Sequence, residues 1–160
     1  MANGIGEYRG IPVVNGDIFE SGADIIVHQV NCQGVMGSGV ARQVRERYPN
    51  VYNKYAEECK KSNPLGKILI VRADNADNSK PLIANLFAQD KYGYDGGCYT
   101  DYEALQKCLD ALNICAKGMT VAIPYMMSCY RGGANWEIVA RMIINTLKDC
   151  DVTFYKYNKG

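Results

Sequence analysis

Two glycine-bearing segments contain the residues of this chain with the clearest chemical potential. One lies at residues 34–39 (GVMGSG) and the other at residues 128–134 (SCYRGGA). Both follow apolar runs and precede amphipathic segments. Glycine lets the backbone approach a ligand closely, and a helix N-terminus supplies unpaired N–H groups at a positive dipole end. Two such loops at one edge of a sheet suit a diphosphate held between them, although purely structural turns use the same residues.

Five polar side chains near these segments are candidate reactive groups. His28 is the only histidine, and the ordinary histidine pKa of about 6.5 suits proton transfer near neutral pH. A histidine on a buried strand is also a common core residue. Asp90 and Asp95 either hold a water molecule or are surface charges, and Arg131 either screens phosphate charge or is simply solvated. Cys129 has no second histidine to act as its base, so a thiol nucleophile is disfavoured.

The glycine and cysteine spacings exclude several common sites. No Gly-Lys-Ser or Gly-Lys-Thr follows the first segment, as a Walker motif requires, and its glycine spacing differs from the dinucleotide-binding fingerprint. ATPase and dehydrogenase chemistry are therefore not expected. The seven cysteines are scattered without a C-x-x-C spacing, which favours reduced thiols over a zinc site or a disulfide framework. We expect no metal and no cofactor.

The totals are those of one ordinary domain of 160 residues, with 48% apolar and 22% charged residues. Lys and Arg number 18 against 17 Asp and Glu, so the net charge of +1 gives no general attraction to nucleic acids or membranes. No apolar run approaches the roughly 20 residues of a membrane span, and the N-terminal sequence MANGIGEYRG lacks the plan of a signal peptide. We expect an intracellular, cytoplasmic protein.

Strands and helices alternate in an order that places both glycine-bearing segments at one edge of a sheet. Apolar or alternating runs predict strands at residues 11–14, 24–31, 67–72, 81–89, 119–124 and 152–157. Helical spacing predicts helices at residues 40–61, 101–117 and 135–149, with a break or kink at Pro49 and with Thr100 and Asn135 as N-caps. Residues 73–80 and 92–100 are predicted loops. This order predicts one α/β domain with three α/β/α layers and a mixed, mostly parallel central sheet.

Three motifs together resemble one known family. They are NGDI at residues 15–18, HQVNCQGVMGSGVARQVRERYP from His28, and AIPYMMSCYRGGANWEIV from Ala122. In this combination and order the chain is similar to macro domains. It is most similar to the branch of ADP-ribose 1''-phosphate phosphatases and of terminal or DNA-linked ADP-ribose glycohydrolases. The resemblance implies a single macro domain over residues 1–160 that binds ADP-ribose or an ADP-ribosylated molecule.

The resemblance also implies which residues form the ligand site. Asp17 matches the acidic residue that accepts a hydrogen bond from the adenine amino group, with Ile18 beside it. Asn31 and Gln33 fall where the family contacts the distal ribose. The phosphate loops match Gly34, Val35, Gly37, Ser38, Gly39 and Val40 in the first segment, and Ser128, Cys129, Tyr130, Arg131, Gly132 and Gly133 in the second. Tyr155 or Tyr157 takes the place of an aromatic residue that stacks on adenine, or else serves only sheet packing.

At two positions the chain departs from the glycohydrolases of this branch. Those enzymes use a lysine after the fourth strand and an aspartate in the second loop, where this chain has Gln89 and Gly132. Lys91 lies two residues further on, in a register that need not point into the cleft. These departures count against the lysine-dependent mechanism. Tyr130 replaces a glycine that is common in relatives, and we expect it to narrow the cleft.

Two functions compete. The first, which we prefer, is a hydrolase that removes a substituent from the distal ribose, either a 1''-phosphate or a linkage to a protein or nucleic acid. Its candidate catalytic residues are His28, Asn31 and Asp90, with positioning and backbone N–H groups supplying most of the catalysis. The second is a reader that binds free or attached ADP-ribose without turnover, which the missing lysine and aspartate favour. An unrelated α/β domain with merely structural glycine turns ranks behind both.

Overall fold

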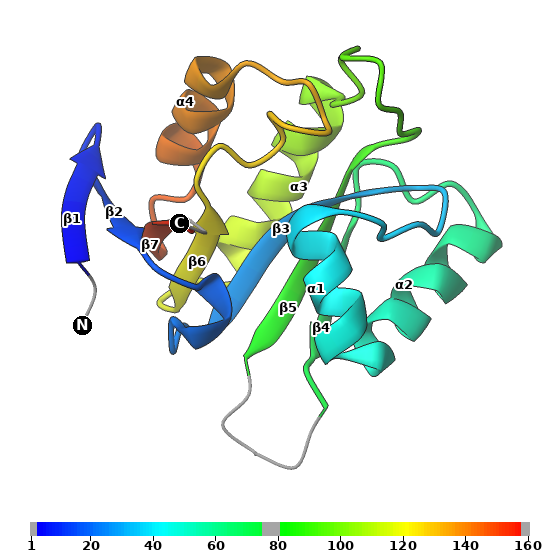
Figure 1. The fold of residues 1–160 in the computed structure, drawn as a ribbon, viewed down its shortest axis with the longest axis horizontal. Helices are drawn as coiled ribbons and strands as arrows, with labels where there is room; N and C mark the ends of the chain where they lie inside the picture. The colour runs from blue at the N-terminus through cyan, green and yellow to red at the C-terminus, as the bar shows by residue number, and fades with distance from the viewer. Residues whose placement is uncertain (1–2, 75–80, 158–160) are drawn as a thin grey trace.

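The computed structural model describes residues 3–74 and 81–157, which form a seven-stranded sheet with helices on both faces (Figure 1). The strands lie in the order β1 (Asn3–Tyr8), β2 (Ile11–Asn15), β7 (Asp151–Lys156), β6 (Thr120–Pro124), β3 (Ile25–Asn31), β5 (Leu82–Gln89) and β4 (Ile68–Arg72). The strands from β2 to β5 in this order are parallel to one another, whereas β1 and β4 run antiparallel at the two edges. The predicted mixed, mostly parallel sheet is confirmed.

Each face of the sheet is covered by a pair of helices. The helices α1 (Gly39–Arg47) and α2 (Pro49–Lys61) pack on one face, and α3 (Tyr102–Cys115) and α4 (Trp136–Thr146) pack on the other (Figure 1). A short 3-10 helix, η1 (Ile18–Glu20), follows β2. This arrangement confirms the predicted α/β/α layers.

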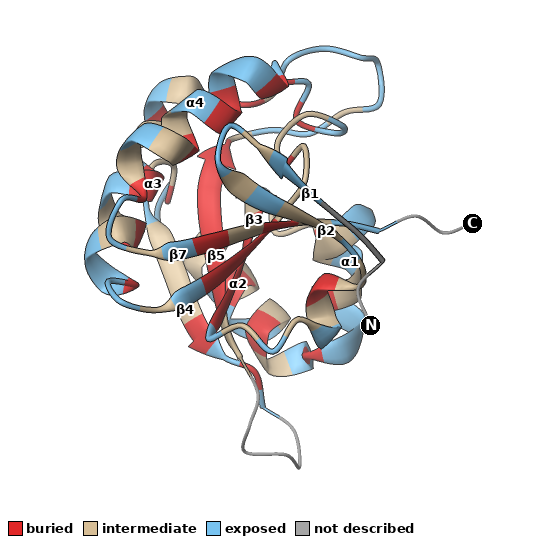
Figure 2. Cartoon of the chain, turned by 90° about the vertical axis from the view of Figure 1, so that its left-hand side faces the viewer, coloured by how far each residue is buried: buried red, intermediate tan, exposed pale blue. Residues whose placement is uncertain are grey.

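The strand β3 is apolar because it is buried on both sides. Its side chains alternate between a core under α3 and α4, which contains Ile25 and Val27, and a core under α1 and α2, which contains Ile26 and Val30. All four side chains are at most 3% exposed. A parallel strand between two helical layers favours apolar residues on both of its faces. Figure 2 shows the central strands buried and the helices buried mainly along their inward faces.

Two local signals set helix boundaries as predicted. The segment 40–61 forms two helices, because Pro49 begins α2 at a position where its missing N–H costs no hydrogen bond. Asn135 caps α4, since its side-chain oxygen accepts a hydrogen bond from the Ile138 N–H at 3.3 Å.

The start of α3 differs from the prediction. Asp101, not Thr100, is the N-cap, because its carboxylate accepts from the Ala104 N–H at 3.0 Å. The Thr100 hydroxyl instead donates to the Ser128 carbonyl oxygen at 3.1 Å. A tertiary contact therefore replaces the predicted local capping bond at Thr100.

The strand β1 is absent from the predicted elements. Its sequence, NGIGEY, is short, contains glycine and lacks a run of apolar residues. Tyr8 at its end packs against Trp136, with ring centroids 5.8 Å apart, and donates a hydrogen bond to Glu137 at 2.6 Å. Contacts with α4 and pairing with β2 thus hold a strand that its own sequence does not predict.

The two predicted loops lie at residues 73–80 and 92–100. Of the loop predicted over residues 73–80, residues 75–80 lie outside the described residues. Residues 92–99 are irregular, as predicted. Across residues 3–74 and 81–157, no helix combines the length and the apolar character needed to cross a membrane.

Candidate functional site

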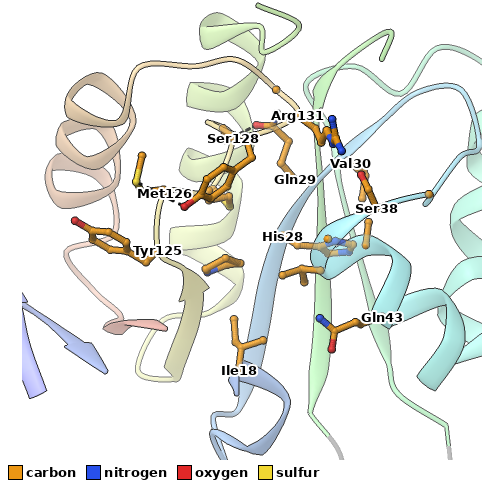
Figure 3. A pocket seen from close by; sticks show the side chains of 18 of the residues that line it. Ile18, His28, Gln29, Val30, Ser38, Gln43, Tyr125, Met126, Ser128 and Arg131 are labelled. Atoms are coloured by element: carbon orange, nitrogen blue, oxygen red, sulfur yellow. Dashed lines mark hydrogen bonds between the residues drawn. The ribbon is translucent and has the colours of Figure 1, made fainter. Parts of the chain in front are cut away.

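A cleft of about 390 Å³ opens where the parallel strands have their carboxyl ends (Figure 3). Residues that end or follow these strands make its wall: 16–18 after β2, 28–31 in β3, 89 in β5, 124–128 and 130–132 at and after the end of β6, and 155–157 at and after the end of β7. Residues 35, 37–41, 43 and 92–94 complete the wall. Open α/β sheets bind ligands at this edge, where loops lead from strands into helices.

The first loop, residues 31–39, is shaped by the side chain of Asn31. Its Nδ2 donates to the Val35 carbonyl at 2.8 Å, and its Oδ1 accepts from the Gln33 N–H at 2.9 Å. The hydroxyl of Tyr55, which is fully buried in α2, also donates to Asn31 Oδ1 at 2.8 Å. Asn31 lines the cleft, and these bonds make it a residue that positions the loop.

Most residues predicted for the phosphate loops line the cleft. They are Val35, Gly37, Ser38, Gly39, Val40, Ser128, Tyr130, Arg131 and Gly132. Four predicted residues do not belong to its wall, namely Gln33, Gly34, Cys129 and Gly133. Gln33 and Gly34 line a separate cavity of about 690 Å³ between the first loop and α2.

Asp90, a predicted catalytic residue, also lies outside the wall of the cleft. Its backbone carbonyl and its carboxylate accept from Gln33 Nε2 at 3.0 Å and 3.3 Å. The two side chains therefore contact each other beside the first loop. The sequence predicts Gln33 at the distal ribose and Asp90 as a residue that holds a water molecule, but neither side chain lines the cleft.

Close packing against Thr100 fixes the second loop, residues 128–134. A Cβ atom at Gly132 would overlap Thr100 Oγ1 and would lie 2.8 Å from Gln29 Nε2. The Gly132 carbonyl accepts from the Thr100 N–H at 2.9 Å, which holds the two segments together. Only glycine fits at position 132, which corresponds to the aspartate of the glycohydrolases that the sequence resembles.

Four polar side chains form a neutral hydrogen-bonded network beneath the second loop. Gln29 Nε2 donates to Gln89 Oε1 and to Thr100 Oγ1, both at 2.9 Å, and Gln29 Oε1 accepts from the Ser128 hydroxyl at 2.5 Å. Gln89 Nε2 donates to the Lys91 carbonyl at 2.9 Å. Gln89, at the lysine position of the glycohydrolases, thus makes hydrogen bonds to other residues of the protein through both its amide oxygen and its amide nitrogen. Sequence reasoning missed Gln29 and Thr100, although a glutamine inside the apolar run DIIVHQVN was an available signal.

Burial keeps His28 neutral. The side chain is 2% exposed, and its Nε2 lies 2.7 Å from Asn85 Oδ1. Asn85 Nδ2 donates to the Leu69 carbonyl at 3.0 Å, so Asn85 Oδ1 faces His28, and His28 Nε2 carries the imidazole proton. Burial lowers the pKa of His28 to about 4. His28 lines the cleft, where burial favours its neutral form at pH 7 and disfavours a role as general acid.

Asp17 and Ile18 line the end of the cleft next to β2. Asp17 Oδ1 accepts from the Phe19 N–H at 2.9 Å and thereby caps η1, and Asp17 Oδ2 lies 3.5 Å from Arg47 Nη2. Two contacts orient this carboxylate without using up its acceptor sites. Figure 3 shows Ile18 at one end of the cleft and Ser128, Gln29 and Arg131 at the other.

Exposed tyrosines surround the mouth of the cleft. Those that line it are Tyr92, Tyr94, Tyr130 and Tyr157, between 44% and 79% exposed. Arg131 stacks on Tyr94, with its guanidinium carbon 4.3 Å from the ring centroid. Tyr130, expected to narrow the cleft, stands at its rim and is 79% exposed. Tyr155 also lines the cleft and packs partly against the core under α1 and α2.

Other reactive side chains near the cleft have structural roles. Asp95 accepts from the Gly97 N–H at 2.9 Å and the Tyr99 hydroxyl at 2.7 Å, bonds that hold the pKa of its carboxyl below the usual range. Burial raises the pKa of the Cys129 thiol to about 11, which disfavours a thiolate nucleophile. In the described part of the chain, no group of three or more His, Cys, Asp or Glu side chains is arranged to hold a metal ion.

Two relatives share parts of this sequence. The chain is 30% identical over 155 residues to the DNA ADP-ribosyl glycohydrolase of Mycobacterium tuberculosis, which covers 91% of this chain and 42% of that protein. It is 32% identical over 94 residues to the ADP-ribose 1''-phosphate phosphatase of Meyerozyma guilliermondii, which covers 50% of this chain and 54% of that protein. The chain spans about half the length of these curated relatives.

The fold and a family match agree with these relatives. The macrodomain of Mycobacterium tuberculosis DarG superposes with a TM-score of 0.75 at 26% identity, covering 91% of this chain and 98% of that one. The macro domain family matches residues 27–143, which include β3, β5, β6 and both glycine-bearing loops. This chain belongs to the macro domain family.

Proposed function

We propose that the cleft binds ADP-ribose, with the diphosphate between the two glycine-bearing loops. The observation that carries this proposal is that residues 35 and 37–40 of the first loop and residues 128 and 130–132 of the second loop line one cleft (Figure 3). Loop N–H groups and the start of α1 would donate to the phosphate oxygens. Asp17 would accept the adenine amino proton at one end, and the distal ribose would lie near Asn31 and Gln29 at the other.

We further propose that the cleft hydrolyses a substituent of the distal ribose, with a 1''-phosphate as the preferred substituent. One of the two relatives is named for this phosphatase activity. Hydrolysis of a glycosidic linkage is less well supported, because Gln89 and Gly132 supply no acid–base pair. Catalysis would come from positioning and from backbone N–H groups that stabilise charge on the phosphate. Asn31 would contribute by holding the first loop, and neutral His28 by forming a polar wall.

A reader without turnover is the second candidate. The network of Gln29, Gln89, Thr100 and Ser128 favours it, because these neutral side chains provide no general acid or base at the distal end. A reader needs only the binding half of the same cleft.

The test is a phosphorus NMR time course with ADP-ribose 1''-phosphate and three proteins: wild type, Asp17→Ala and the control Asp110→Ala on the exposed face of α3. Protein-dependent release of phosphate supports the phosphatase, and shifted diphosphate signals without release leave the reader and exclude this reaction. Asp17→Ala should weaken binding about tenfold through the lost charge-assisted hydrogen bond, while Asp110→Ala should not. No shift and no release with a folded protein would overturn the ADP-ribose proposal.

A further inference from the structure

We infer that Ser128 presents a hydrogen-bond acceptor, and no donor, to the distal end of the cleft, where it recognises a hydroxyl group of the ligand's distal ribose. This inference rests on the proposed binding of ADP-ribose. Ser128 lines the cleft beside Gln29 and across from Ser38 (Figure 3).

Two backbone carbonyl groups, which can only accept, fix the direction of the network. Gln89 Nε2 lies 2.9 Å from the Lys91 carbonyl, so the amide nitrogen of Gln89 faces that carbonyl and its Oε1 faces Gln29. Thr100 Oγ1 lies 3.1 Å from the Ser128 carbonyl oxygen, so its one proton points there. The Thr100 oxygen must then accept from Gln29.

Both constraints orient the Gln29 amide in the same way. Its two Nε2 protons go to Gln89 Oε1 and Thr100 Oγ1, and its Oε1 therefore faces Ser128. Because that oxygen only accepts, the Ser128 hydroxyl must donate its single proton to it across 2.5 Å. Ser128 Oγ is left with lone pairs and with no proton to offer a ligand.

An acceptor without a proton discriminates between the groups of ADP-ribose. It attracts a sugar hydroxyl, which donates a proton, and it repels a phosphate oxygen, which is an anionic acceptor at neutral pH. In the proposed binding mode Asp17 and Ile18 lie at the adenine end of the cleft, and Ser128 lies at the other end. The hydroxyl-bearing group at that end is the distal ribose.

The backbone of Ser128 also points to a function for this side chain. Its φ of +75° lies in the left-handed region, which residues other than glycine adopt rarely and often at functional sites. The conformation is held by the Ser128 carbonyl, which accepts from the Thr100 hydroxyl and from the Ala134 N–H at 2.9 Å. A glycine would satisfy this backbone at lower cost, so the hydroxyl is the part that a ligand would use.

The test is a pair of calorimetric titrations, with ADP-ribose and with ADP, which lacks the distal ribose. Ser128→Ala and Ser128→Gly should each lower the affinity for ADP-ribose about five- to tenfold and leave the affinity for ADP within about twofold. Ser62→Ala, at an exposed serine after α2, should change neither. An equal loss for both ligands, or no loss, would overturn the inference while leaving the proposed binding intact. Failure of the wild type to bind either ligand would overturn both.

Gln29 is the positioning residue in this scheme, and a double-mutant cycle tests its role. Gln29→Ala should lower the ratio of ADP-ribose affinity to ADP affinity, because Ser128 is then free to rotate its proton toward the ligand. Adding Ser128→Ala to Gln29→Ala should lower that ratio no further. Additive losses in a protein whose thermal unfolding remains cooperative would contradict the coupling of the two side chains.

Discussion

The two glycine-bearing loops that face each other across the cleft contain glycines that are required for different reasons. In the first loop, Gly34 and Gly39 have φ values of +79° and +60°, and a Cβ atom at either would meet nothing within 4 Å. In the second loop, a Cβ atom at Gly132 would overlap Thr100 Oγ1. Gly34 and Gly39 are thus required for an unusual backbone conformation, whereas Gly132 is required for space.

The side chains beneath the loops differ as well. Neighbouring residues of a strand point to opposite faces, so His28 shares the α1–α2 side of β3 with Ile26, and Gln29 lies on the α3–α4 side. The first-loop side therefore contains a titratable residue, and the network under the second loop contains none. The two loops should respond differently to substitution and to pH.

The largest expected effect is that of Gly132→Asp, which would install the aspartate of the glycohydrolases. The new side chain overlaps Thr100 and approaches Gln29, so we expect a loss of about 3 kcal/mol in the free energy of unfolding, measured with urea. Gly37→Ala in the first loop is the matched control. Its Cβ atom would meet Val35 Cγ1 at 3.5 Å, an ordinary contact, and should cost less than about 0.5 kcal/mol. Equal losses in the two variants would remove the steric distinction between the loops.

Acid should weaken the first-loop side through His28. Its folded pKa of about 4 lies below the unfolded value of about 6.5, so its contribution to stability is complete above about pH 6.5 and is lost as the pH falls toward about 4. The loss should approach about 3 kcal/mol relative to His28→Gln, which keeps a donor for Asn85 and does not titrate. Urea titrations of both proteins between pH 7 and pH 4 would measure it. Parallel pH profiles would show that His28 is not the titrating group.

A smaller effect is expected from Tyr55→Phe, which removes the buried hydroxyl that ties Asn31 to α2. We expect a loss of about 1.5 kcal/mol in unfolding free energy and weaker binding of ADP-ribose, because the first loop loses its anchor. Tyr52→Phe removes a partly exposed hydroxyl that donates to the Gly34 carbonyl at 2.9 Å, and water can replace it. That control should lose about 0.5 kcal/mol. A larger loss of unfolding free energy for Tyr52→Phe than for Tyr55→Phe would show that Tyr52, and not Tyr55, anchors the first loop.

The elements around both loops could be predicted because their signals are local. The apolar run before the first loop predicts β3, Pro49 predicts the break between α1 and α2, and Asn135 predicts the start of α4. The glycine-bearing segments could be assigned to the carboxyl ends of strands for the same reason. Each of these signals depends on residues that are neighbours in the sequence.

The contacts in and around the cleft could not be predicted in this way. The sequence predicts Thr100 as a helix cap, but the second loop packs against it and the Thr100 hydroxyl donates to the Ser128 carbonyl. The pKa of His28 depends on how completely two helical layers bury it. Asp90 follows a strand that ends in the cleft, but a hydrogen bond from Gln33 holds it beside the first loop. Each outcome is decided by a partner far away in the sequence.

The smallest expected effect comes from substitutions at Gly39, which separate the cost of backbone strain from the cost of steric overlap. Gly39→Ala puts a side chain at a φ of +60° with open space around it, so it should cost about 1 kcal/mol through backbone strain alone. Gly39→Asn should cost less, because asparagine adopts the left-handed region more readily despite its larger side chain. At Gly132 the order should reverse: Gly132→Asn should lower the free energy of unfolding more than Gly132→Ala, because the size of the side chain decides the cost there. Urea denaturation of the four variants measures both orders. If Gly39→Asn lost more unfolding free energy than Gly39→Ala, space would also limit the first loop.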